Sequence, residues 1–228
     1  MSMLRAAYLI ARKDLRIEVR GGDALALMGA LALATVFAFA FTLGERTMNT
    51  LAPERLIPPV LWTALAFASL VGFRQGWAHE AEHDALSGLR LAPVDRSAIY
   101  LGKLAAALVL VLVLEAILVP VSGVIFGADL IPIAGPLTLV LLLHSYGLCA
   151  AGTFLGALVN RLGRGESLAA ILLLPVAVPI LISAGKCTSA ALAGRPLGEV
   201  RFWMVLAGCF AAVITALAVV LFEPLLEE

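Results

Sequence analysis

The stretch Leu104–Phe126 reads LAAALVLVLVLEAILVPVSGVIF and contains a single ionisable side chain, that of Glu115. A helix rising ~1.5 Å per residue needs roughly 20 apolar residues to cross the ~30 Å hydrocarbon core of a bilayer, and this stretch is long enough. Five further stretches meet the same requirement, at residues 24–44, 56–73, 137–159, 167–185 and 202–222. The sequence therefore predicts an all-α membrane protein with six transmembrane helices, in a domain covering residues 24–226.

The composition excludes a soluble globular domain. Apolar residues make up 62% of the chain and the mean hydropathy is +1.03, whereas soluble domains hold roughly 45–50% apolar residues. Lysine and arginine together number 16, and so do aspartate and glutamate, so the formal net charge is zero. Without an excess of positive charge the chain has no electrostatic signal for nucleic acid binding. Membrane lipid is the expected surrounding.

The basic residues are distributed unequally between the two sides of the membrane. An even number of spans places both termini on one side, together with the loops at residues 74–103 and 160–166. That side carries 11 lysines and arginines and the opposite side carries 5. The 11 are Arg5, Arg12, Lys13, Arg16, Arg20, Arg74, Arg90, Arg96, Lys103, Arg161 and Arg164. Because positively charged loops stay in the cytoplasm, both termini are predicted to be cytoplasmic.

Residues 1–23 precede the first span and have helical periodicity. Apolar side chains recur at Leu4, Tyr8, Ala11, Leu15 and Val19, while arginines at positions 5, 12, 16 and 20 occupy another face. Such a basic amphipathic helix is suited to lying in the cytoplasmic membrane interface, where its cations meet anionic headgroups. Two interpretations stay open: a topology anchor alone, or a helix that also contacts a cytoplasmic partner.

The longest hydrophilic stretch between two spans is residues 74–103, RQGWAHEAEHDALSGLRLAPVDRSAIYLGK. Apolar residues from Trp77 to Leu89 recur at helical spacing beside acidic ones, which predicts a short amphipathic helix ending near Gly88 or Pro93. His79 and His83 come without a cysteine, and we expect no zincin pattern of two histidines flanking a glutamate here, so we prefer a solvated or partner-facing surface to a metal site. The candidate residues of this surface are Glu80, Glu82, His83, Asp84, Leu86, Leu89 and Pro93.

Glu115 and His144 are ionisable residues inside predicted spans. Such groups cost ~2.5–3.5 kcal/mol on insertion scales and usually face the interior of the helix bundle or a cavity, so both are candidate functional residues. The alternatives are a structurally paired carboxyl for Glu115 and an imidazole hydrogen-bonded to a neighbouring helix for His144. His144 is in principle able to act as an axial ligand of haem iron, but no neighbouring residue makes that role specific.

Small residues and prolines mark two of the spans. Gly152 and Gly156 form a GxxxG pair, which permits close helix approach either within the molecule or between two copies. Pro175 and Pro179 lie one turn apart in LLLPVAVPILI. Because each proline removes a backbone donor, we expect the fifth span to be kinked or unwound there.

No soluble catalytic set of residues is expected from the sequence. The phosphate-binding GxxxxGK[ST] loop is absent, so the chain does not hydrolyse ATP by that chemistry. The CxxCH and GxSxG motifs are absent as well. Any energy source must therefore be a second chain or an ion gradient.

Three features together resemble the CcmB family, the haem exporter B permeases of the ABC transporter used in cytochrome c maturation. They are the basic amphipathic helix, the loop ending in LRLAPVDRSAIYLGK, and above all RGESLAAILLLPVAVPILISAG at residues 164–185. The resemblance implies an ABC-2-like permease in the bacterial inner membrane, two copies of which pair with two copies of a separate ATPase, CcmA. The loop at residues 74–103 would then be the coupling helix that docks in the ATPase.

The same resemblance implies CcmC, CcmD and the haem chaperone CcmE as further partners. Haem is then the cargo, or it leaves on a chaperone whose release uses ATP. No tightly bound cofactor is expected in this chain, and ATP is expected only on the partner. Two other classes remain: an ABC-2 permease for a lipid, polysaccharide or drug, and an ATP-independent carrier or scaffold.

Overall fold

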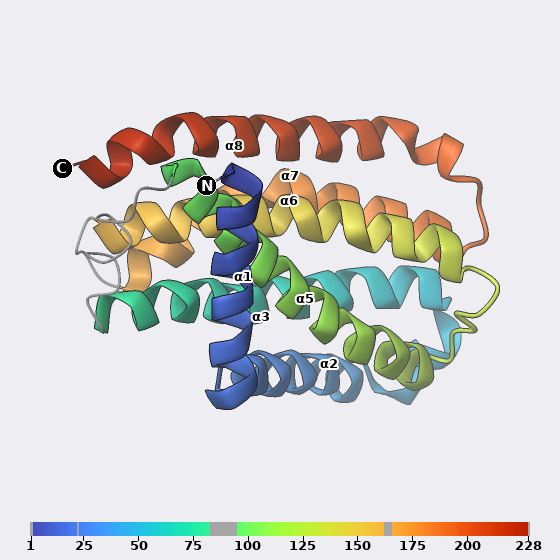
Figure 1. Ribbon diagram of the computed structural model, residues 1–228. Coiled ribbons are helices and arrows are strands. Elements are labelled where there is room, and N and C mark those ends of the chain that lie inside the picture. Colours follow the sequence, from blue (N-terminus) through green and yellow to red (C-terminus); the bar gives the residue numbers. More distant parts are fainter. Residues whose placement is uncertain (1, 22, 83–94, 162–165, 228) are drawn as a thin grey trace.

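In the part of the chain that the structure describes, six long helices form a bundle and a further helix lies across it (Figure 1). The computed structural model describes residues 2–21, 23–82, 95–161 and 166–227. Its elements are α1 (Met3–Gly21), α2 (Asp23–Thr50), α3 (Pro53–Glu82), α5 (Arg96–Phe126), α6 (Ala134–Arg161), α7 (Glu166–Leu192), the short 3-10 helix η1 (Leu197–Val200) and α8 (Arg201–Glu227). Helix α3 is central, because it packs against α2, α5, α6 and α7.

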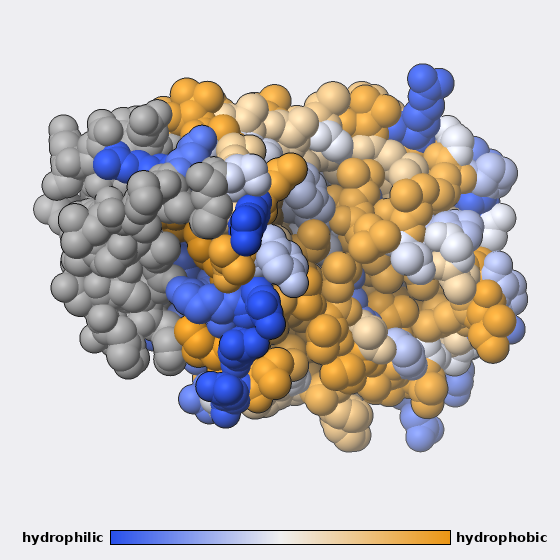
Figure 2. Space-filling view, in the orientation of Figure 1, coloured by the Kyte–Doolittle hydropathy of each residue, from blue (hydrophilic) through white to orange (hydrophobic). Residues whose placement is uncertain are grey.

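The six predicted spans are confirmed. Helices α2, α3, α5, α6, α7 and α8 each contain a segment long and apolar enough to cross a membrane. Figure 2 shows the apolar surface between α1 and the far end of the bundle. The most exposed apolar residues of the six helices are Phe41, Val124, Phe202 and Val220, at 84%, 85%, 69% and 70% exposure. Such residues need hydrocarbon rather than water around them.

The segment predicted as a loop at residues 74–103 is helical at both of its described ends. Arg74–Glu82 continue α3, and Arg96–Lys103 form the start of α5. Trp77 accordingly belongs to α3 rather than to a separate amphipathic helix. The physical reason is that an apolar run marks only the part of a helix inside hydrocarbon, and no proline ends α3 after Phe73. We call this end of the bundle, where α3 finishes and α5 starts, the loop end.

The predicted amphipathic helix before the first span is confirmed as α1, but of its predicted apolar stripe only Ala11 is buried on the bundle. The side chains buried against the other helices are those of Ala6, Ala7, Ile10 and Ala11, and α1 packs mainly on α5. Leu4, Tyr8 and Val19 are 74%, 64% and 86% exposed. The close approach requires Gly102 of α5, since a Cβ there would lie 2.8 Å from the Ala7 carbonyl oxygen and 2.8 Å from Ile10 Cβ.

A carboxylate fixes the corner between α1 and α2. Glu18 Oε1 accepts a hydrogen bond of 2.7 Å from the backbone nitrogen of Leu25, in the first turn of α2. Amides in the first turn of a helix have no partner within the helix, and a negative charge is favourable there. Glu18 therefore holds α2 at its observed angle to α1.

The prolines of α7 do not unwind it. The helix is continuous through Pro175 and Pro179, so the expected unwinding is wrong, while a kink stays a prediction. The backbone instead departs from helical geometry at Gly44 in α2, with φ 67° and ψ 162°. Positive φ is accessible to glycine without a steric penalty. Gly44 is also the residue at which the first predicted span ends.

The GxxxG pair of α6 serves packing within the molecule. A Cβ on Gly152 would lie 2.0 Å from the Phe73 ring, and one on Gly156 would lie 2.8 Å from the Trp77 ring. Two aromatic side chains of α3 thus fill the space that the two glycines leave on α6. Of the two alternatives that the sequence left open, the intramolecular one is confirmed.

We expect Gly152→Ala to destabilise the protein by about 1–3 kcal/mol, because the added methyl group displaces the Phe73 ring in a packed interior. The apparent melting temperature in detergent measures the effect. Gly185→Ala is the matched control, since a Cβ at that helical position of α7 meets no atom within 4 Å. An equal melting temperature for the two variants would contradict the packing argument.

Candidate functional site

A buried lysine joins three helices at the loop end. The side chain of Lys103, in the second turn of α5, is only 4% exposed. Its Nζ lies 3.3 Å from Asp14 Oδ2 of α1 and donates a 2.8 Å hydrogen bond to the Gly76 carbonyl of α3. It also lies 4.7 Å from the centre of a Trp77 ring. A carboxylate, a carbonyl and an aromatic face therefore replace the water that the ammonium group loses.

This arrangement fixes α1 relative to the two helices that lead into residues 83–94. Burying an ammonium group without partners costs several kcal/mol, so the contacts of Lys103 define one favourable position for each helix. Asp14 also pairs with Lys13 at 2.9 Å, which leaves its carboxylate between two cations. We call Asp14, Gly76, Trp77 and Lys103 the junction.

The start of α5 is held by its own cap. Asp95 Oδ1 accepts a 3.0 Å hydrogen bond from the backbone nitrogen of Ser97 and a second hydrogen bond from the Ser97 hydroxyl. These hydrogen bonds from Ser97 lower the pKa of Asp95 below its usual value. Aspartate is a favoured N-cap residue for this reason. The cap fixes where α5 begins.

The predicted surface residues of the loop lie only partly within the described chain. The backbone of Glu80 and Glu82 belongs to the last turns of α3. His83, Asp84, Leu86, Leu89 and Pro93 lie outside the described residues. Glu80 and Glu82 thus belong to the same helix as Gly76 and Trp77 of the junction.

The histidines of this segment have the spacing of a zinc-binding motif. Residues 79–83 read HEAEH, an H-E-x-x-H spacing that on a helix places two histidines on one face. The expected absence of a zincin pattern is therefore wrong, and histidine and carboxylate alone can bind zinc. His83 lies outside the described residues, and a zinc ligand set here stays a hypothesis from spacing alone.

Glu115 lies in the bundle interior between α5 and α6. It is 3% exposed, and its Oε1 accepts a hydrogen bond from the Ser145 hydroxyl. Its Oε2 is buried with no hydrogen-bond partner in the described part of the chain. No hydrogen bond or ion pair joins Glu115 to His144, so the two intramembrane candidates do not form one site.

His144 of α6 connects to three other helices. Its Nδ1 lies 2.7 Å from the Val140 carbonyl, and its Nε2 lies 2.8 Å from the Ser183 hydroxyl of α7, which donates to the Trp203 carbonyl of α8 at 2.7 Å. The ring also meets Trp62 of α3 edge to face, with centroids 5.8 Å apart. Both nitrogens of the fully buried ring are occupied. Binding iron there would require breaking this network.

Sequence reasoning missed the junction. Asp14 and Lys103 are 89 residues apart, and each was counted only as a charge outside the spans. A signal does exist, since Lys103 directly precedes the most apolar stretch of the chain, where a cation needs a partner or the membrane surface. That signal identifies the lysine but not its partner. Among the described residues, no group of three His, Cys, Asp or Glu side chains could hold a metal ion.

Comparison with known proteins gives consistent matches along the chain. The profile of the CcmB protein family matches residues 5–223. The heme exporter protein B of Rhodobacter capsulatus is 32% identical over 205 residues, covering 89% of this chain and 90% of that protein. The heme exporter protein B of Bradyrhizobium diazoefficiens is 30% identical over 195 residues, covering 84% of each chain. That of Paracoccus denitrificans is 31% identical over 189 residues, with 80% and 82% covered.

We expect Lys103→Met to lower the stability of the protein by about 1–3 kcal/mol, because Asp14 and the Gly76 carbonyl lose a buried donor. The apparent melting temperature in detergent again measures the change. Arg195→Gln is the control: its ion pair with Glu199 spans 3.8 Å between side chains that are 50% and 55% exposed. Such an exposed pair contributes about 0–1 kcal/mol. Equal melting temperatures for Lys103→Met and the control would contradict the stabilising role of the junction.

Proposed function

Because this chain belongs to the CcmB family, we propose that it is the permease subunit of an ABC transporter complex in c-type cytochrome biogenesis. The complex would export haem or use ATP to release a haem-loaded chaperone. The observation that carries the proposal is the family match over residues 5–223, together with relatives of matching length named heme exporter protein B. The chain is a permease subunit and not itself an enzyme.

The energy source is proposed to be a separate ATPase subunit of the CcmA kind. The sequence lacks a phosphate-binding loop of its own, so the complex needs a second chain for ATP hydrolysis. The other proposed partners are a second copy of this chain and CcmC-like, CcmD-like and CcmE-like proteins. The excess of basic residues on one side supports a bacterial inner-membrane orientation with both termini and the loop end in the cytoplasm.

The loop after α3 is the proposed docking point for the ATPase. Helix α3 is continuous from Pro53 to Glu82, so it extends from the opposite end of the bundle to the residues that enter the loop. A displacement of the loop would therefore move α3 as a rigid element. The junction would carry the same displacement to α5 and α1, since Lys103 binds groups on all three helices.

The described interior offers little to haem as a cargo. A path for haem is expected to provide axial ligands and cations for the propionates. His144 has both ring nitrogens occupied. Glu115 is the only carboxyl within the six apolar stretches of the sequence. Met28 of α2 is 1% exposed and packs at Gly72 of α3. This inventory favours energy coupling without direct haem contact.

Reversing the charge at two acidic positions of the α3 terminus tests the docking proposal. We expect Glu80→Lys/Glu82→Lys to reduce copurification of the ATPase by about tenfold or more while membrane insertion is unchanged. Glu45→Lys/Glu54→Lys, near the opposite end of the bundle, is the matched control. The experiment also tests the orientation, because a cytoplasmic ATPase reaches the loop only on that side. Normal copurification and normal cytochrome c yield from the first variant would contradict both.

Haem titration separates the two mechanisms. We expect the purified permease with its ATPase to bind haem weakly, and His144→Asn to leave the haem absorbance titration unchanged within about twofold. The asparagine amide can still donate to the Val140 carbonyl, so it tests iron ligation with little loss of packing. Stoichiometric haem that is lost in His144→Asn would instead establish direct transport through this subunit.

A further inference from the structure

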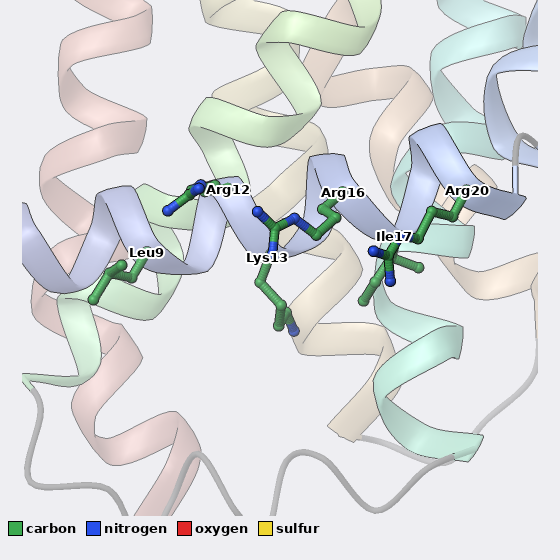
Figure 3. Close-up of a pocket in the computed structure, with 6 residues that line it drawn as sticks. All are labelled: Leu9, Arg12, Lys13, Arg16, Ile17 and Arg20. Atoms are coloured by element: carbon green, nitrogen blue, oxygen red, sulfur yellow. The ribbon is translucent and has the colours of Figure 1, made fainter.

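One face of α1 carries a row of three arginines. Arg12, Arg16 and Arg20 follow one another at intervals of four residues and are all exposed. Together with Lys13, Leu9 and Ile17 they line a hollow of about 270 Å³ (Figure 3). Because a helix rises ~1.5 Å per residue, the row extends over about 12 Å along one face.

The three arginines have no hydrogen-bond or ion-pair partner among residues 2–21, 23–82, 95–161 and 166–227. Lys13 is different, because it pairs with Asp14 at 2.9 Å. Like charges four residues apart destabilise a helix by about 0.2–0.5 kcal/mol per pair. An anionic ligand would turn this repulsion into attraction, so the row is a favourable site for negative charge.

The position of α1 narrows the kind of anion. The helix lies across the bundle beside the start of α2, the first membrane span, and so at the level where hydrocarbon begins (Figure 1). An adjacent stripe of the same helix exposes Leu4, Tyr8 and Val19. A helix with one exposed apolar stripe and one cationic face lies in the headgroup region of a membrane.

We propose that the hollow on α1 is a binding site for the phosphate of an anionic phospholipid. The planar guanidinium groups of Arg12, Arg16 and Arg20 bind phosphate oxygens in pairs, which a lysine does not do. Leu9 and Ile17, which line the same hollow, contact the apolar part of the lipid. These two side chains favour a phospholipid over an acidic protein surface, which would leave them against polar groups. The proposal depends on the chain being a membrane protein and not on its cargo.

The test uses the full chain purified in detergent and titrated with phosphatidylglycerol or phosphatidylcholine. Each basic residue near an anionic surface contributes about fivefold in affinity, so Arg12→Gln/Arg16→Gln/Arg20→Gln should weaken phosphatidylglycerol binding by about a hundredfold. Binding of phosphatidylcholine should be unchanged. Arg46→Gln/Arg55→Gln/Arg201→Gln removes three exposed arginines elsewhere and should leave phosphatidylglycerol binding within about twofold. Native mass spectrometry counts the bound lipid in each case.

The remaining outcomes overturn the proposal. Equal loss of phosphatidylglycerol binding in both triple variants would show a general charge effect without a site. If inorganic phosphate displaced phosphatidylglycerol from the chain at an equal concentration, the ligand would be a free anion. Unchanged lipid binding with lost ATPase copurification would make the row a protein-docking surface. Because lipid binding is measured without ATP or haem, its failure is distinguishable from a failure of the proposed function.

Discussion

The structure depends on one constraint, that a backbone crossing hydrocarbon finds no water and must satisfy its own hydrogen bonds. Six long helices meet this constraint, and it accounts for the continuity of α5 and α7 through their prolines. Each proline removes one donor, but the surrounding helical bonds persist because no alternative partner exists in lipid. The interruption of α2 falls at Gly44, where the apolar run ends and water can again bond the backbone.

Helices surrounded by lipid gain little from hiding apolar side chains from one another, so close packing has to hold them together. Glycine provides the close approach in several pairs of neighbours. Gly72 of α3 receives Met28, Gly102 of α5 receives α1, and Gly152 and Gly156 of α6 receive aromatic rings of α3. The small residue lies on one helix and the large one on its neighbour, which fixes the relative rotation of both.

Polar side chains add the contacts that packing alone does not specify. His144 connects α3, α6, α7 and α8 in the interior, and Lys103 connects α1, α3 and α5 at the loop end. Helix α3 takes part in both sets through Trp62 and Gly76. The ATPase docking proposed above requires one rigid element that reaches from the loop end into the membrane. The arrangement of α3 meets that need, and the polar contacts determine which helices follow it.

The number of spans, the helix before them and the family resemblance were all predictable from the sequence, because apolar length, periodicity and motifs are local properties of the chain. Glu115 and His144 could be named as buried polar residues for the same reason. The tertiary structure decided which face of α1 packs on α5, that Gly152 and Gly156 meet α3 rather than a second copy, and that Lys103 pairs with Asp14. These outcomes depend on how each helix is rotated against its neighbours. Rotation is set by contacts between residues far apart in the chain, which no local pattern records.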